Sequence, residues 1–225
     1  QSVSFRADQA TGALMTPAEL AAINTPDAVL TRRMSKTFFA GEDSIADYTV
    51  NYRKDGQQIR SFSVNFYGTG NWRATDQANV TSETPLSISM SFRRFNASTE
   101  QQITDNIASL GSAAVDLKMP DPSSTKTPKD ETIIGKRTSI THFTGDDAIA
   151  DYTENFRTGT NTLRSTSVNF YEHQNELPDQ DLDNDGVKGE QGMFLVRAKD
   201  ADPDDRLAQS VSFRADQATG ALMTP

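Results

Sequence analysis

The chain has 225 residues, of which 35% are hydrophobic, and it carries a formal net charge of −9 at pH 7 without any cysteine. This length accommodates one large domain or two of ordinary size, and the lack of cysteine excludes disulfides and thiolate metal sites. The acidic surface disfavours nucleic acid as a partner, and no stretch approaches the roughly 20 apolar residues of a membrane span. This balance suits a secreted or cation-binding protein.

One segment, QSVSFRADQATGALMTP, opens the chain at residues 1–17 and recurs unchanged at residues 209–225. Its apolar residues Val3 and Phe5 alternate with serines, which predicts a strand with one apolar face. A related strand, SISMSFRRF, occupies residues 87–95. We therefore divide the chain into repeat one (1–95), repeat two (96–208) and the start of a third repeat (209–225).

A short helix is expected after the first two copies of this strand. In TPAELAAIN, Thr16 fits the N-cap, Pro17 the first helical position and Glu19 the third residue of a capping box. In STEQQITDNIASLG, Ser98 is the expected cap and Gly111 the expected terminator. Each repeat is thus predicted to contain one short helix.

The remaining elements of repeat one read as strands. ADYTVNY (46–52) and RSFSVNF (60–66) alternate between apolar and polar residues, and the first places Asp47 on the polar side with Thr49. Between them, Asp55-Gly56 is typical of a hairpin turn.

These strands recur in repeat two. Residues 31–67 align with residues 135–171 at a shift of 104, and 20 of the 37 positions are identical. We therefore predict a mainly β fold of two homologous tandem domains, each a β-sandwich or small barrel. Phe66 and Phe170 should be buried at equivalent sites, and so should Tyr48 and Tyr152.

The middle copy of the SVSF-type strand, at 87–94, is predicted to be the seam between the repeats, where it either completes the sheet of repeat one or begins that of repeat two. A strand with one apolar face needs a sheet for its backbone and its side chains. The copy at 209–216 should complete the sheet of repeat two. The copy at 1–8 should then have no sheet of its own and either pair with another molecule or extend unpaired.

The best candidate metal site is the loop DQDLDNDGVKGEQG at 179–192, within an insertion near 175–192. It resembles the calcium loops of EF-hands, dockerins and thrombospondin type 3 repeats, although position twelve is Gly192 and not glutamate. Alternating carboxylates before a glycine suit calcium, which takes six to eight oxygen ligands. The predicted ligands are Asp181, Asp183, Asp185, Glu190 and the carbonyl of Val187. The alternative is an acidic, solvated turn.

A second acidic pattern occurs at Glu42, Asp43 and Asp47 and returns 104 residues later. It is interpreted as a polar turn with a capping aspartate in preference to a cation site. Catalytic motifs are lacking, because His142 and His173 are the only histidines and no nucleophile, metalloprotease or phosphate-loop pattern is present. The chain is predicted not to be an enzyme.

In repeat two, LRSTSVNFY is followed by MFLVRAKDAD and then by SVSFRADQATGALMTP, which contains Phe213, Gly220, Leu222 and Pro225. In repeat one, NFYGTGNW ends with Trp72. This order of segments resembles the β-rich module of bacterial flagellar hook proteins, with those four residues at the positions of the family's pattern and NFYGTGNW at its hairpin exit. The resemblance implies a secreted, self-assembling structural protein. The leading hypothesis is a repeat unit of an extracellular filament that joins copies of itself through strands. An adhesin stalk or surface-layer segment is the first alternative, and a carbohydrate-binding module or an enzyme is the next.

Overall fold

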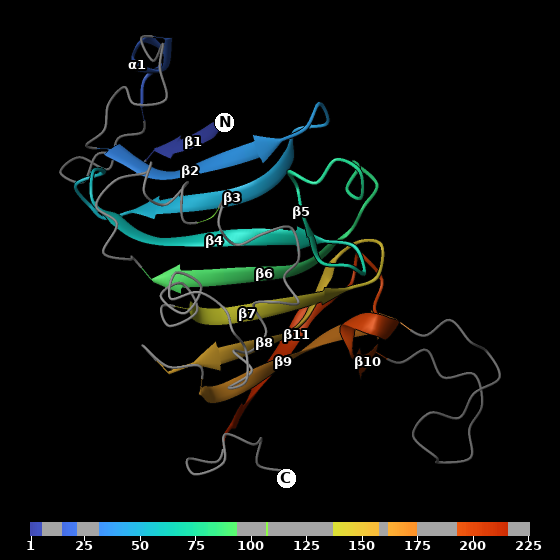
Figure 1. Cartoon of the computed structure of the whole chain (residues 1–225). Helices are drawn as coiled ribbons and strands as arrows, with labels where there is room; N and C mark the ends of the chain where they lie inside the picture. Colours follow the sequence, from blue (N-terminus) through green and yellow to red (C-terminus); the bar gives the residue numbers. More distant parts are fainter. Residues whose placement is uncertain are drawn as a thin grey trace, which may run out of the picture.

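The computed structural model describes residues 1–5, 15–21, 32–93, 107, 137–157, 162–174 and 193–215. Of these residues, 60% lie in strands and 8% are helical, which confirms the mainly β prediction. The described strands form one 11-stranded sheet (Figure 1), although two separate sandwiches or barrels were expected. No helix among the described residues is long and apolar enough to cross a membrane.

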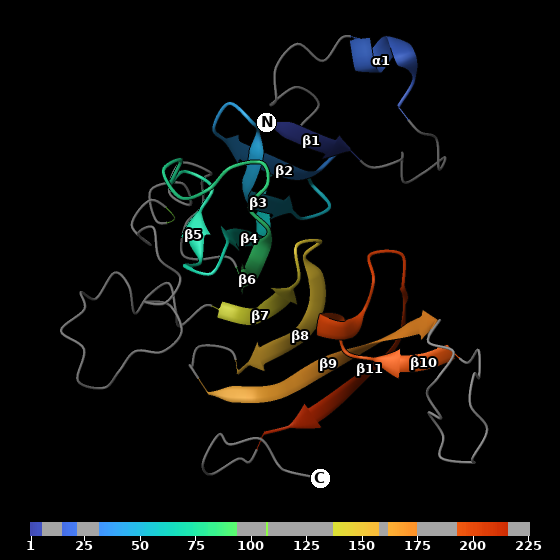
Figure 2. The same cartoon turned by 90° about the vertical axis from the view of Figure 1, so that its right-hand side faces the viewer.

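The sheet is antiparallel throughout and runs in the order β1-β2-β3-β4-β6-β7-β8-β9-β10, with β5 beside β4 and β11 beside β9. Figure 2 shows the strands of repeat two turned relative to those of repeat one, as the usual twist of a sheet requires. The strands are β1 (Ser2–Phe5), β2 (Arg33–Ala40), β3 (Ile45–Tyr52), β4 (Ile59–Tyr67), β5 (Trp72–Arg73), β6 (Leu86–Arg93), β7 (Arg137–Thr144), β8 (Ile149–Phe156), β9 (Leu163–Gln174), β10 (Met193–Val196) and β11 (Arg206–Arg214).

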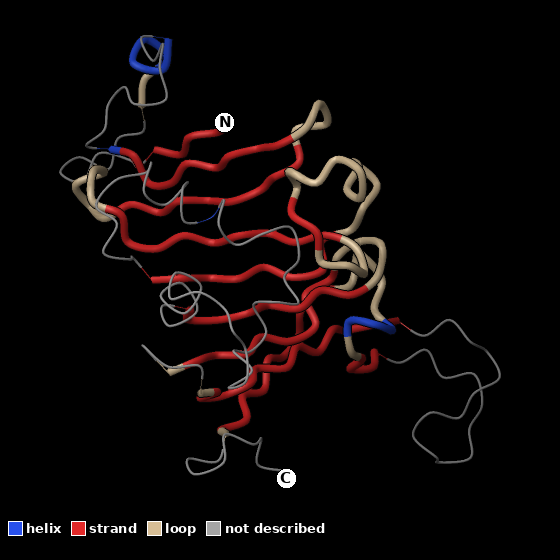
Figure 3. The backbone as a smooth tube through the Cα atoms, in the orientation of Figure 1, coloured by secondary structure: helices blue, strands red, loops and turns tan. Residues whose placement is uncertain are grey.

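The helix α1 (Pro17–Ala21) lies beyond β1 at the end of the sheet (Figures 1 and 3), and its Glu19 forms an ion pair of 3.6 Å with Arg32, the residue before β2. The predicted capping box is confirmed: Thr16 N–H donates to the Glu19 carboxylate at 2.7 Å, and Glu19 N–H donates to Thr16 Oγ1 at 3.2 Å. Leu20 is 51% exposed. Of the second predicted helix only Ile107 is described, and it is helical, whereas Ser98 and Gly111 lie outside the described residues.

The predicted β3–β4 hairpin is also confirmed. Gly56 has a φ of 67°, a left-handed conformation that glycine adopts without strain. The carboxylate of Asp55 accepts the backbone N–H groups of Gln57 and Gln58 at 3.0 and 2.9 Å. These bonds fix the turn and therefore the register of the two strands.

One face of the sheet carries the hydrophobic core, which is centred on repeat one. Phe62, Val64 and Phe66 are at most 1% exposed, and Ile107 packs against them at 1%. The core also includes buried side chains from β3, β6 and β7, among them Tyr48, Val50, Ile88, Met90, Phe92 and Ile140.

Repeat two is less well covered, so the prediction of equal burial is wrong. Phe170 and Tyr152 are only half-buried, whereas Phe66 and Tyr48 are buried. Three core positions have become polar, with His142 at the position of Phe38, Glu154 at that of Val50 and Thr166 at that of Phe62. A face with these groups needs water or hydrogen-bond partners and cannot close into an equally dry core.

Much of the opposite face carries small polar side chains that pair from strand to strand, and Tyr67, Ala74 and Val80 form a second, smaller buried cluster. The hydroxyls of Thr37 and Thr49 lie 3.0 Å apart, and those of the equivalent residues Thr141 and Thr153 also lie 3.0 Å apart. Ser89 Oγ donates to Asn65 Oδ1 at 3.0 Å. These pairs hold neighbouring strands together on the face away from the core.

The N-terminal strand does not behave as expected. β1 pairs with β2 of the same chain, so the prediction of a strand that is unpaired or paired with another molecule is wrong. Val3 and Phe5 are half-buried while Ser2 and Ser4 are exposed, which matches the predicted alternation. The outer edge of β2 offers free backbone groups, and β1 satisfies them.

Candidate functional site

The strand β6 joins the two repeats, because β4 of repeat one pairs with one edge and β7 of repeat two pairs with the other. Met90 lies opposite Val64 on one side and Ile140 on the other. One strand therefore closes the sheet of repeat one and opens that of repeat two.

The terminal strands each reproduce one half of this arrangement. Val3 of β1 pairs with Lys36, which is the repeat-one counterpart of Ile140. Val211 of β11 pairs with Val168, which is the repeat-two counterpart of Val64. The irregularity that separates Ser91 from Phe92 in the β6–β7 ladder recurs between Ser4 and Phe5 in the β1–β2 ladder. The identical SVSF segments of β1 and β11 thus pair with β2 and β9 in the registers in which β6 pairs with β7 and β4.

A buried ion pair anchors this fold in repeat one. The register shift between Phe38 and Phe39 places an extra residue, Asp47, in β3, and such a bulge turns its side chain towards the core. Arg73 Nε donates to Asp47 Oδ1 at 2.8 Å, and Nη2 donates to Oδ2. The two side chains are 6% and 5% exposed. The remaining nitrogen, Nη1, donates to the carbonyl of Ile107 at 2.8 Å, so this pair also holds Ile107 against the sheet.

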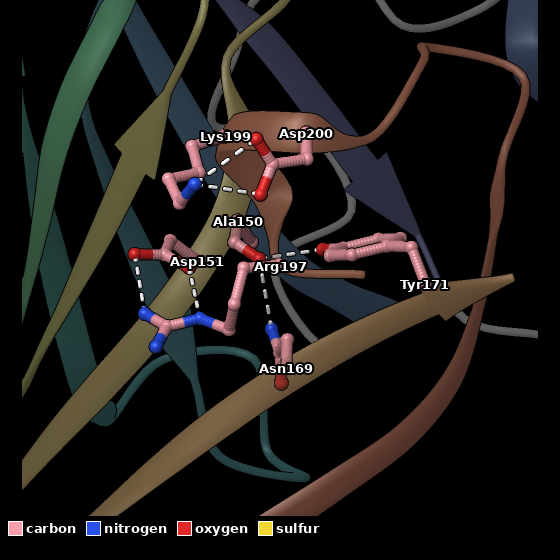
Figure 4. Close-up of polar contacts among 7 residues, drawn as sticks. All are labelled: Ala150, Asp151, Asn169, Tyr171, Arg197, Lys199 and Asp200. Carbon is pink, nitrogen blue, oxygen red and sulfur yellow. Dashed lines mark hydrogen bonds and ion pairs between the residues drawn. The ribbon is translucent and has the colours of Figure 1, made fainter. Parts of the chain in front are cut away.

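Repeat two contains the equivalent pair, Asp151 and Arg197 (Figure 4). Arg197 Nε and Nη2 donate to the two carboxylate oxygens at 2.8 and 2.7 Å. This pair is more open, with side-chain exposures of 38% for Arg197 and 17% for Asp151. Among the described residues, no carbonyl accepts a hydrogen bond from Arg197 Nη1 in the way that the Ile107 carbonyl accepts one from Arg73 Nη1.

A tyrosine and an asparagine brace the strand beside each pair. Tyr171 Oη and Asn169 Nδ2 donate to the carbonyl of Ala150 at 2.5 and 3.1 Å (Figure 4), and Tyr67 and Asn65 make the same contacts with Ala46. Burial raises the pKa of both tyrosines, so their hydroxyls stay protonated and donate.

A repeated motif in the sequence contains the arginine of each pair, although the alternation of apolar and polar residues in the strands does not indicate it. RATD at 73–76 returns as RAKD at 197–200, a shift of 124 and not 104, because an insertion separates them from the aligned strands. The predicted polar turn is confirmed for Glu42 and Asp43, which lie exposed in it, but the prediction of Asp47 as a cap is wrong, since Asp47 is buried within β3.

The predicted calcium ligands Asp181, Asp183, Asp185, Val187 and Glu190 lie outside the described residues. Within the described part, one other group has the composition of a metal site: His173, Asp202 and Asp205. His173 Nδ1 lies 2.8 Å from Asp205 Oδ2 and 3.6 Å from Asp202 Oδ2. One imidazole with two carboxylates suits a transition metal better than calcium, which prefers oxygen ligands alone.

Two arginine-lined hollows occupy equivalent places in the two repeats. Arg157 and Arg164 line a hollow of about 920 Å³, together with Arg93 and Arg214 from the seam strands. Their counterparts in repeat one line the smaller hollow, which includes Asn51, Arg53, Arg60 and Ser61. Guanidinium groups bind carboxylates, sulfates and phosphates through paired N–H donors, so both hollows have the chemistry of an anion site.

Comparison with known proteins gave no family model, no curated protein and no solved structure that matches this chain.

Proposed function

We propose that the chain is a non-enzymatic repeat unit of an extracellular bacterial filament or fibre, in which successive units share β-strands. The observation that carries the proposal is the position of β6 between β4 and β7, with β1 and β11 each forming one of its two ladders in the same register. Within the chain, this junction already joins one repeat to another.

The polarity of the strands indicates how two copies would join. β1 is antiparallel to β2, and β11 is antiparallel to β9. Relative to their neighbours, β11 and β1 both have the orientation that β6 has relative to β4 and β7. If β11 of one copy lay directly beside β1 of the next, with the copies oriented as the repeats are, the two strands would therefore run parallel. If instead one of the two strands is displaced and the other lies between β9 and β2, the ladder matches that of β6. Such strand exchange needs no new interface.

The first expected result is concentration-dependent association of the whole chain that a peptide of residues 1–8, QSVSFRAD, inhibits. The peptide should compete because it has the sequence of both exchanging strands, and a scrambled peptide should not. Sedimentation velocity over a concentration series measures both effects. An adhesin stalk or surface-layer segment, the alternative proposal, would remain an elongated monomer at every concentration.

The second expected result concerns calcium, which we propose binds Asp181, Asp183 and Asp185 with Val187 and Glu190. Titration calorimetry should show calcium binding to the parent chain and to His173→Ala, and loss of binding in Asp183→Ala. Thermal unfolding should then shift upwards with calcium in proportion to RT ln(1 + [L]/Kd). Absence of heat with the parent chain, or loss of binding in His173→Ala alone, would contradict the proposal.

A further inference from the structure

Leu20 of α1 has a counterpart, Ile107, that lies in a different environment. Leu20 follows Phe5 of β1 by 15 positions, and Ile107 follows Phe92 of β6 by the same 15. An alanine comes next in both segments, in TPAELAAIN and ITDNIASLG. The residue in each case belongs to a helix. Leu20 and Ile107 are therefore equivalent residues of equivalent helices.

Their exposures are opposite. Ile107 is 1% exposed, lies in the core of repeat one and accepts a hydrogen bond from Arg73 through its carbonyl. Leu20 is 51% exposed, and no residue of α1 is buried. Ile107 packs on the repeat that precedes its strand, so α1 would have to pack on a repeat that precedes β1. The described part of the chain offers no such repeat to α1.

Repeat two presents the matching surface. Val168 and Phe170 of β9, with Val211 and Phe213 of β11, are half-buried, whereas their counterparts Val64, Phe66, Met90 and Phe92 are fully buried. Arg197, the counterpart of the arginine that binds the Ile107 carbonyl, is 38% exposed where Arg73 is 6% exposed. This face thus has both the apolar surface and the donor that receive the helix in repeat one.

We infer that α1 of one copy docks on the repeat-two face of a second copy, with Leu20 in the place of Ile107 and its carbonyl on Arg197 Nη1. The inference rests on the proposed strand sharing, because the helix reaches that face only when β1 of its own copy lies beside β9 of the other. It adds the identity of the exchanging strand: β1 enters and β11 is displaced. The helix then covers the repeat-two face of the second copy. Its packing there adds to the stability that the backbone hydrogen bonds between strands give the junction.

The direct test uses the absence of natural cysteine. A nitroxide is attached to the variant Ala18→Cys, at an exposed residue of α1 that leaves Leu20 in place, and this unlabelled protein is mixed with nitrogen-15-labelled parent chain. The amide signals of Val168 and Phe170 should broaden, because the label lies on their face. The signals of Val64 and Phe66 should stay sharp, since Ile107 already covers them. Equal broadening at both pairs, or at neither, would overturn the inference.

A second measurement separates the helix from the strand. Leu20→Ala should raise the Kd of self-association about tenfold, equivalent to about 1.4 kcal/mol at 25 °C. It should leave the unfolding temperature of the monomer unchanged, because Leu20 is exposed there. Leu195→Ala, at a similarly exposed leucine (54%) on β10, is the matched control and should leave the Kd unchanged. If Leu20→Ala associates like the parent and QSVSFRAD still competes, the helix inference is wrong and strand sharing stands. If the parent does not associate, both are wrong.

Discussion

Replacing Arg73 with leucine should lower the free energy of unfolding by about 3–5 kcal/mol, the usual cost of removing one partner of a buried ion pair. Asp47 would remain 5% exposed and lose both hydrogen bonds from the guanidinium, and the carbonyl of Ile107 would lose its donor. Urea denaturation followed by circular dichroism measures the change.

The matched control is Arg197→Leu in repeat two. This guanidinium is 38% exposed, so water can replace much of its interaction with Asp151, and the loss should be about 1 kcal/mol or less. If the two variants lose equal stability, the difference in burial between the two pairs has no energetic consequence, and the view that Arg73 anchors Ile107 fails.

Truncation of Phe66 to alanine should cost about 3–5 kcal/mol, the range found when large aromatic side chains are removed from close-packed cores. Phe66 is 0% exposed and lies in the same cluster as Phe62, Val64 and Ile107. The change leaves a cavity that these neighbours fill only in part.

The equivalent change in repeat two, Phe170→Ala, should cost about half as much or less, because part of this ring is already in contact with water. The comparison requires a monomeric sample at low concentration, since docking of a second copy on this face would add stability. Equal losses from Phe66→Ala and Phe170→Ala would show that repeat two has a complete core of its own.

Local features of the fold could be predicted from the sequence because they depend on neighbouring residues. Thr16 and Glu19 form the expected capping box, and Asp55-Gly56 forms the expected turn. The alternation of Phe62, Val64 and Phe66 correctly identified the core face of β4. Each of these patterns acts over only a few residues, so composition and spacing specify it.

Features that depend on strand partners could not be predicted in the same way. Alternation assigns a residue to a face, but it does not say which strand lies alongside. It therefore left open whether β6 completes repeat one or begins repeat two, whereas β6 does both, and the single sheet was missed. Alternation also fails at a bulge: it places Asp47 with Thr49 on the polar face, whereas the extra residue in β3 turns the carboxylate to Arg73. In the sequence, the recurrence of RATD as RAKD is the pattern that marks this arginine as a feature of both repeats, alongside the recurring aspartate.

The direction in which the sheet grows has a mechanical consequence. Strands stacked as β2, β3, β4 and β6 extend the sheet at right angles to their own length, by about 4.8 Å per strand, so each repeat adds about 19 Å. In a fibre built this way, tension along the fibre axis acts in the direction of the hydrogen bonds between strands, so these bonds break one after another. Strands pulled along their own length instead load all the hydrogen bonds between them at once. Resistance to pulling would then come mainly from side chains that pack from one strand to the next. These side chains are buried in repeat one and half-buried in repeat two. Under load, the repeat-two junction would open first wherever α1 of a second copy does not cover its half-buried face.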